Sequence, residues 1–152
     1  MKLHHIAYRV KDRYQAVAFF METFGYRVQD EFEVDFDDGS KAKCVALEHD
    51  ELHQVFVSDG DKDSIVGKWV HSHRPRIHHI AYLVDSVLET MVEWQAMGYE
   101  FTTEEPLTCP GIVQIFTKPN EHTDMIYEFI ETTNKGFCKD NVKNLMQSTK
   151  GI

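Results

Sequence analysis

The sequence lacks long hydrophobic runs and clusters of basic residues. No stretch approaches the ~18 apolar residues of a transmembrane helix, and the opening MKLHHIAYRVKDR has no signal-peptide core. Acidic residues outnumber basic ones by 25 to 16, which gives a net charge of −9. We therefore expect no membrane span, and the charge argues against binding to nucleic acid or an anionic membrane. A partner that is a small molecule fits this composition better.

Cysteine is also scarce. The three residues Cys44, Cys109 and Cys138 are odd in number and show no paired spacing. This pattern predicts free thiols and a cytoplasmic protein. A chain of 152 residues with 42% hydrophobic residues is long enough for one domain with a sizeable core.

The pentapeptide HHIAY occurs twice, at 4–8 and again at 78–82. The similarity continues beyond it. Each copy begins a strand-like run, which is followed by a polar cap, a helix-period stretch, a glycine (Gly25 or Gly98) and a tyrosine. Such self-similarity indicates an internal duplication.

Each copy is followed by three predicted strands. They are 26–35, 41–48 and 52–58 in the first half, and 99–104, 111–118 and 124–131 in the second. The sequence therefore predicts an α+β fold of two βαβββ modules that form a curved sheet with the two helices outside. We expect a single domain, with module one at 1–58, a linker at 59–76 with one or two helical turns around 63–69, module two at 77–132, and a C-terminal closing helix at 133–152.

Strand alternation divides the repeated motif between the two faces of the sheet. His5 and His79 are expected to face into the cup, whereas His4 and His78 are expected beneath the helices. The shift along the chain that aligns His5 with His79 also superposes Gln54 on Glu128 in the last strand of each half. The repeat thus predicts four polar inward residues around a pseudo-twofold axis.

Two imidazoles, a carboxylate and an amide oxygen suit one divalent metal. Fe(II), Mn(II), Co(II), Ni(II) and Zn(II) all accept such donors. We therefore interpret His5, Gln54, His79 and Glu128 as metal ligands. The alternative is a duplicated core that retains hydrogen-bonded polar groups without a metal.

Two βαβββ modules, an H-I pair early in each, and Gln or Glu in the last strand resemble the vicinal oxygen chelate superfamily. That superfamily includes glyoxalase I, methylmalonyl-CoA epimerase, extradiol dioxygenases and antibiotic-binding resistance proteins. The resemblance spans the whole chain. It implies a metal-dependent enzyme or a small-molecule binding protein.

The segment QIFTKPNEHTDMIYEFIETTNKGFCKDNVKNL, residues 114–145, is similar to the carboxyl-terminal end of 4-hydroxyphenylpyruvate dioxygenases. This resemblance implies an iron triad of His5, His79 and Glu128. It also implies that Gln114 contacts substrate and that Phe137 lines or gates the pocket. Unlike that family, the sequence contains no additional pair of modules, and it has Gln54 at a position where the family has no ligand.

The leading functional hypothesis is a mononuclear non-haem iron dioxygenase that acts on a small 2-oxo acid. A glyoxalase-type or methylmalonyl-CoA epimerase-type isomerase or lyase is the alternative favoured by Gln54, and a metal-free binding protein is the third. Glu48 is a candidate proton-transfer base, and Arg9, if it points into the cup, is a candidate partner for an anionic substrate. A homodimer is plausible for a single pair of modules.

Overall fold

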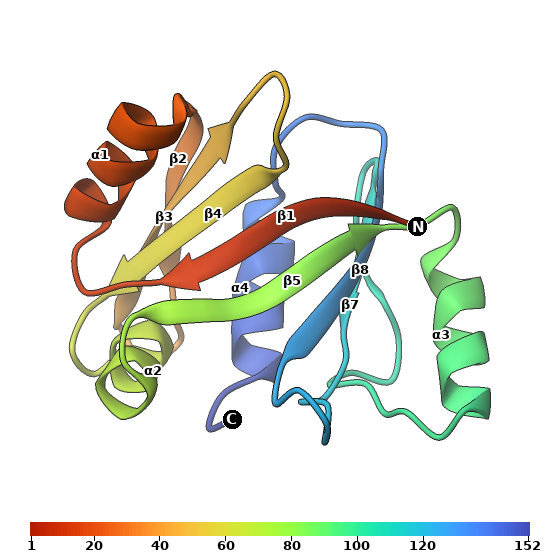
Figure 1. The fold of residues 1–152 in the computed structure, drawn as a ribbon. Coiled ribbons are helices and arrows are strands. Elements are labelled where there is room, and N and C mark those ends of the chain that lie inside the picture. The colour runs from red at the N-terminus through yellow and green to blue at the C-terminus, as the bar shows by residue number, and fades with distance from the viewer.

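The computed structural model describes residues 1–152 and contains one eight-stranded mixed sheet with four helices (Figure 1). The strands are ordered β2-β3-β4-β1-β5-β8-β7-β6 across the sheet. The elements of the first half are β1 (Lys2–Arg9), α1 (Arg13–Phe24), β2 (Arg27–Asp35), β3 (Lys41–Glu48) and β4 (Gln54–Gly60). They are followed by α2 (Ile65–His73), β5 (Arg76–Leu83), α3 (Val87–Ala96), β6 (Leu107–Cys109), β7 (Ile112–Phe116), β8 (Ile126–Thr132) and α4 (Lys139–Ser148).

The two copies of the repeat meet at the centre of the sheet. Strands β1 and β5 pair antiparallel, and Ile6 lies opposite its counterpart Ile80. Each central strand then pairs in parallel with the last strand of its own half, β1 with β4 and β5 with β8. The predicted fold class, two βαβββ units that form a curved sheet, is confirmed.

The helices that follow β1 and β5 pack on the outer face, as predicted. Helix α1 begins after Asp12, whose side chain accepts hydrogen bonds from two backbone N–H groups, and ends at Gly25 in the left-handed conformation (φ 78°). Its residue Phe20 packs with Leu47 and Val55 of the sheet. Figure 1 shows α1 and α3 at opposite ends of the sheet.

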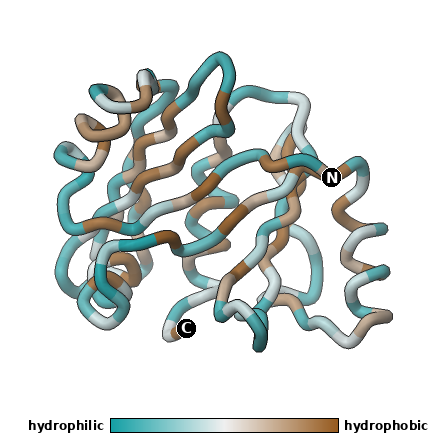
Figure 2. Tube along the Cα trace, viewed as in Figure 1, coloured by the Kyte–Doolittle hydropathy of each residue, from teal (hydrophilic) through white to brown (hydrophobic).

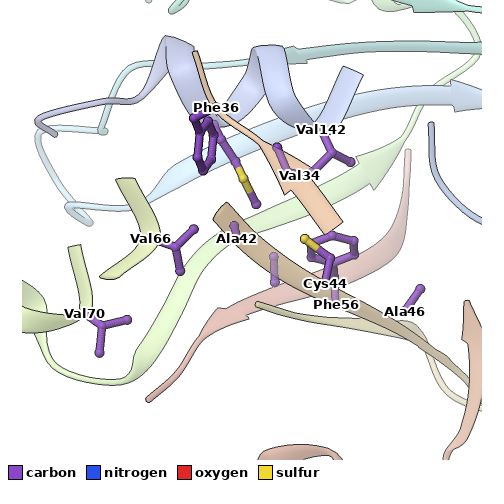
Figure 3. Packing of buried hydrophobic residues seen from close by; sticks show 11 residues of the cluster. Val34, Phe36, Ala42, Cys44, Ala46, Phe56, Val66, Val70 and Val142 are labelled. Carbon is purple, nitrogen blue, oxygen red and sulfur yellow. The ribbon is translucent and has the colours of Figure 1, made fainter. Parts of the chain in front are cut away.

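Helices α2 and α4 fill the inner face instead. Val66 and Val70 of α2 and Val142 of α4 pack against inward side chains of β2, β3 and β4, among them Phe56 (Figure 3). Hydrophobic segments follow the strands in Figure 2, whereas most connecting turns are hydrophilic. The linker thus contains a helix of nine residues, somewhat longer than the one or two turns expected there, and α4 covers the cup.

Two predictions about the second half and the cysteines are wrong. Residues 99–104 form no strand, because only Phe101 makes an isolated bridge, to Thr117, and the short edge strand β6 begins at Leu107. Cys109 and Cys138 form a disulfide, so of the three cysteines only the buried Cys44 is a free thiol. The cytoplasmic location remains a prediction that has lost this support. None of the four helices has the length and apolar character needed to cross a bilayer.

Candidate metal centre

The repeated motif brings two histidines together at the middle of the cup. His5 lies opposite Ala81 in the β1–β5 pair, and His79 lies opposite Ala7. Directly opposed residues of an antiparallel pair project from the same face, so the two alanines leave room between the imidazoles. Glu128 is placed beside Ala81 by the parallel pairing of β5 with β8.

The three side chains converge on one point. Nε2 of His5 lies 3.4 Å from Oε2 of Glu128, and Nε2 of His79 lies 3.7 Å from Oε1. All three donor atoms lie within 4.8 Å of one another. Two bonds of about 2.1 Å to one ion span up to about 4.2 Å between donors, so small side-chain adjustments allow all three to bind the same ion.

Burial keeps this cluster uncharged in the absence of a cation. Desolvation raises the pKa of Glu128 to about 8, an effect that a hydrogen bond from Gln114 opposes. Desolvation also lowers the pKa of His79 to about 3 and holds that of His5 well below its usual range. Although the distances are those of ion pairs, near neutral pH the contacts therefore join neutral groups.

The donor set fits a divalent first-row metal. Both histidines direct Nε2 towards Glu128, and Oε2 of Glu128 is buried without a hydrogen-bond partner. An orphaned buried oxygen is unusual in a folded protein, and a metal ion would satisfy it. Imidazole and carboxylate donors in a two-histidine, one-carboxylate set are typical of Fe(II) and are also compatible with Mn(II), Co(II), Ni(II) and Zn(II).

The predicted equivalence of Gln54 and Glu128 is wrong because the two halves differ in register. Strand β4 pairs with β1 so that Gln54 lies opposite His5, whereas β8 pairs with β5 so that Glu128 lies opposite Ala81. The residue opposite Ala7, which corresponds to Ala81, is Phe56. A phenyl ring thus occupies the position that is symmetrical to the carboxylate.

Gln54 lies outside the cavity in which the donors meet. Its amide nitrogen is 3.4 Å from Nε2 of His4, and its Oε1 is buried without a partner. Glu48 is also displaced, at the end of β3, where it accepts a hydrogen bond of 3.1 Å from Nε of Arg27. Strand β4 separates β3 from the central strands, so we assign Glu48 no catalytic role.

The cavity itself is enclosed by the sheet and the carboxyl-terminal segment. Gln114 lines it and accepts a hydrogen bond of 3.1 Å from Asn141 of α4, a residue that sequence reasoning missed. Phe137 packs its ring 4.9 Å from that of His5. Only about 30 Å³ remains free, which is room for one or two water molecules.

Arg9 points into the cup, as the strand alternation predicts. Its side chain is buried, lines the same cavity as the three donors, and has no partner for Nη1. No carboxylate pairs with it, and its guanidinium carbon lies 5.4 Å from the centroid of the Trp69 ring. Buried guanidinium groups usually have a charged partner, so this one is suited to an anion that enters the cavity.

The first histidine of each pair is not beneath a helix, contrary to the prediction. His4 and His78 are each skipped in the β1–β5 register, as bulge residues, so their rings turn towards the cup. Nδ1 of His4 lies 2.7 Å from Nδ1 of His5, and Nδ1 of His78 lies 2.8 Å from Nδ1 of His79. The doubled histidine is the signal in the sequence for this arrangement, but a prediction that assumes strict alternation of side chains cannot include a bulge.

The family comparison agrees with this fold and site. Residues 4–109 match the family described as Glyoxalase/Bleomycin resistance protein/Dioxygenase superfamily, and the chain belongs to this family. Members act on small molecules and typically bind a divalent metal. No curated protein sequence matches the chain.

Solved structures of two kinds of enzyme share the fold. A mutant of 4-hydroxymandelate synthase from Streptomyces coelicolor superposes with a TM-score of 0.84 at 17% identity over 98% of this chain, which spans 53% of that protein. Methylmalonyl-CoA epimerase from Mycobacterium tuberculosis gives 0.72 at 18% identity, over 88% of this chain and 89% of the epimerase. At these identities the likeness shows the fold alone.

Proposed function

We propose that this protein is a metal-dependent dioxygenase that acts on a small acid, with His5, His79 and Glu128 as the metal ligands. The observation that supports the proposal most directly is the meeting of their three donor atoms within 4.8 Å in a buried cavity. An iron(II) ion bound there would supply the activation of O₂ for oxidation of a bound 2-oxo acid.

The number of protein donors favours the dioxygenase over other chemistry in this family. Because Phe56 stands where a symmetrical fourth ligand would lie, the protein supplies three donors. A divalent ion held by these three donors would still be open to a chelating acid and to a further small ligand. Gln114, held by Asn141, orients the Glu128 carboxylate within this set.

The remaining cavity residues define the substrate. Arg9 is the one unpaired cation in the wall and is placed to bind an anionic group. Phe56, Phe116 and Phe137 provide apolar walls. Together they favour a small acid with an apolar or aromatic portion.

An epimerase or isomerase is the second candidate, supported by the fold that the chain shares with methylmalonyl-CoA epimerases. Such a reaction needs a base that is free to move a proton. Apart from Glu128 no carboxylate lines the cavity, which leaves His78 as the remaining candidate base.

The test is anaerobic reconstitution with Fe(II), followed by 4-hydroxyphenylpyruvate and related 2-oxo acids, and then air. The proposal predicts O₂ uptake matched by CO₂ release, both abolished in Glu128→Ala. The epimerase reading predicts instead that the Co(II)-loaded protein exchanges the α-proton of methylmalonyl-CoA with D₂O in the absence of O₂. Exchange without O₂ uptake for any 2-oxo acid would overturn the dioxygenase proposal.

A further inference from the structure

The two bulge histidines contact the metal-binding imidazoles in the same way in both halves. Each contact joins two Nδ1 atoms at 2.7 or 2.8 Å. Two nitrogen atoms approach this closely only when one of them bears a hydrogen and the other presents a lone pair. The contacts are therefore hydrogen bonds between neighbouring imidazoles, and the direction of each bond remains to be assigned.

The position of Nε2 assigns the direction. In His5 and His79, Nε2 faces Glu128 and must present its lone pair to bind a metal. A neutral imidazole with a free Nε2 has its hydrogen on Nδ1. Each metal-binding histidine is consequently the donor, and the preceding histidine is the acceptor.

We propose that His4 and His78 are positioning residues, which accept hydrogen bonds from Nδ1–H of His5 and His79 and thereby fix the tautomer and orientation of both metal ligands. This inference rests on the proposed metal site and goes beyond it. Hydrogen bonds of this kind orient the imidazole and increase its basicity towards the metal. The repeat thus encodes each ligand together with its acceptor as one H-H pair.

The surroundings of His4 support the same tautomer. If Nδ1 of His4 accepts, its Nε2 has a hydrogen to donate, and the atom 3.4 Å away is assigned as Nε2 of Gln54, another donor. A flip of the side-chain amide exchanges its nitrogen and oxygen. The flip would place the orphaned Oε1 of Gln54 against Nε2–H of His4 and so satisfy both groups.

In the second half no side chain accepts a hydrogen bond from Nε2 of His78, because the two halves differ in register. Glu128, the sequence counterpart of Gln54, lies at the metal position, and Nε2 of His78 is buried without a partner. With Nδ1 as acceptor, this Nε2 is an N–H donor. His78 and Arg9 line the same cavity, so both would offer hydrogen-bond donors to an anion that entered it.

The direct test is NMR of the Zn(II)-loaded protein labelled with ¹⁵N-histidine. The expected result is two slowly exchanging Nδ1–H groups, on His5 and His79, each with a ¹⁵N–¹⁵N coupling across the hydrogen bond to Nδ1 of His4 or His78. Zinc bound at the triad with no such couplings, or with the hydrogen on the other histidine, would overturn the inference alone. Absence of zinc binding would overturn the proposed metal function as well.

Substitution separates positioning from a structural role. His78→Phe removes the acceptor and retains an aromatic ring, and Co(II) affinity is expected to fall about 10–100-fold with a shifted visible spectrum of bound Co(II). The unfolding midpoint should change little, because the variant removes one buried unpaired N–H, on His78, and leaves another, on His79. His78→Asn, which retains an acceptor, should recover part of the affinity. His73→Phe is the control, since His73 stacks on Trp69 and contacts neither ligand. Unchanged Co(II) affinity in His78→Phe would refute the proposal.

Discussion

Replacement of Glu128 by glutamine should stabilise the metal-free protein and abolish metal binding. The carboxyl group is 1% exposed, and burial raises its pKa from 4.5 to about 8. The unfolded chain therefore ionises at a lower pH than the folded protein does. For an acid with a raised pKa, stability is lost as the pH rises from 4.5 towards 8. An amide of the same shape has no such loss.

The size of the effect follows from the two pKa values. Each pH unit over which only the unfolded state is ionised lowers the free energy of unfolding by about 1.4 kcal/mol. Between pH 4.5 and pH 7 the loss reaches roughly 3 kcal/mol, and it levels off near roughly 5 kcal/mol above pH 8. The free energy of unfolding of metal-free Glu128→Gln is expected to exceed that of the wild type by these amounts and to equal it near pH 4.5.

The assay is urea unfolding of chelator-treated wild type and Glu128→Gln from pH 4.5 to 9. Both proteins should also lose stability below about pH 6.5, because His5 and His79 are buried with lowered pKa values. The difference between the two curves removes this shared contribution. A variant that is less stable than the wild type at pH 8 would refute the electrostatic reasoning. Added Zn(II) should stabilise the wild type only.

Three further predictions concern Gln54, Arg9 and the disulfide. Gln54→Ala should change the Co(II) affinity measured by calorimetry less than about threefold, because the side chain of Gln54 contacts only His4. A loss of affinity above about tenfold would show that Gln54 is a metal ligand. Arg9→Met should raise KM for an anionic substrate about 10–100-fold without lowering the unfolding midpoint, whereas Arg76→Met, at an exposed arginine beside Trp69, should leave KM unchanged. Serine at both Cys109 and Cys138 opens a loop with a sequence separation of 29 and should reduce the free energy of unfolding by about 3–4 kcal/mol; an unchanged value would show that the disulfide does not stabilise the fold.

Much of the fold could be predicted because the duplication supplied each pattern twice. The HHIAY strands, the helices after them and the glycines that end those helices follow from local periodicity and from the alignment of the two copies. The inward orientation of His5, His79 and Arg9 follows from strand alternation alone. Glu128 follows from the alignment of the two copies and from the family resemblance, although its equivalence with Gln54 does not hold.

The errors arise where tertiary pairing departs from the repeat. A gap-free alignment of the two copies cannot reveal that β4 and β8 differ in register. Because of this difference, Phe56 and not Gln54 occupies the position that corresponds to Glu128. Strict alternation likewise cannot reveal bulges, which turned His4 and His78 towards the cup. The Cys109–Cys138 disulfide joins an edge strand to the start of α4, and the spacing of the cysteines does not encode that proximity.

The most direct test is anomalous X-ray diffraction from crystals of the Co(II)-loaded protein, measured at the cobalt absorption edge. We expect one anomalous peak within about 2.2 Å of Nε2 of His5, Nε2 of His79 and a Glu128 oxygen, with Gln54 uncoordinated. A peak bound by any other set of residues, or no peak in the cup at full cobalt loading, would show that these three residues are not the metal ligands.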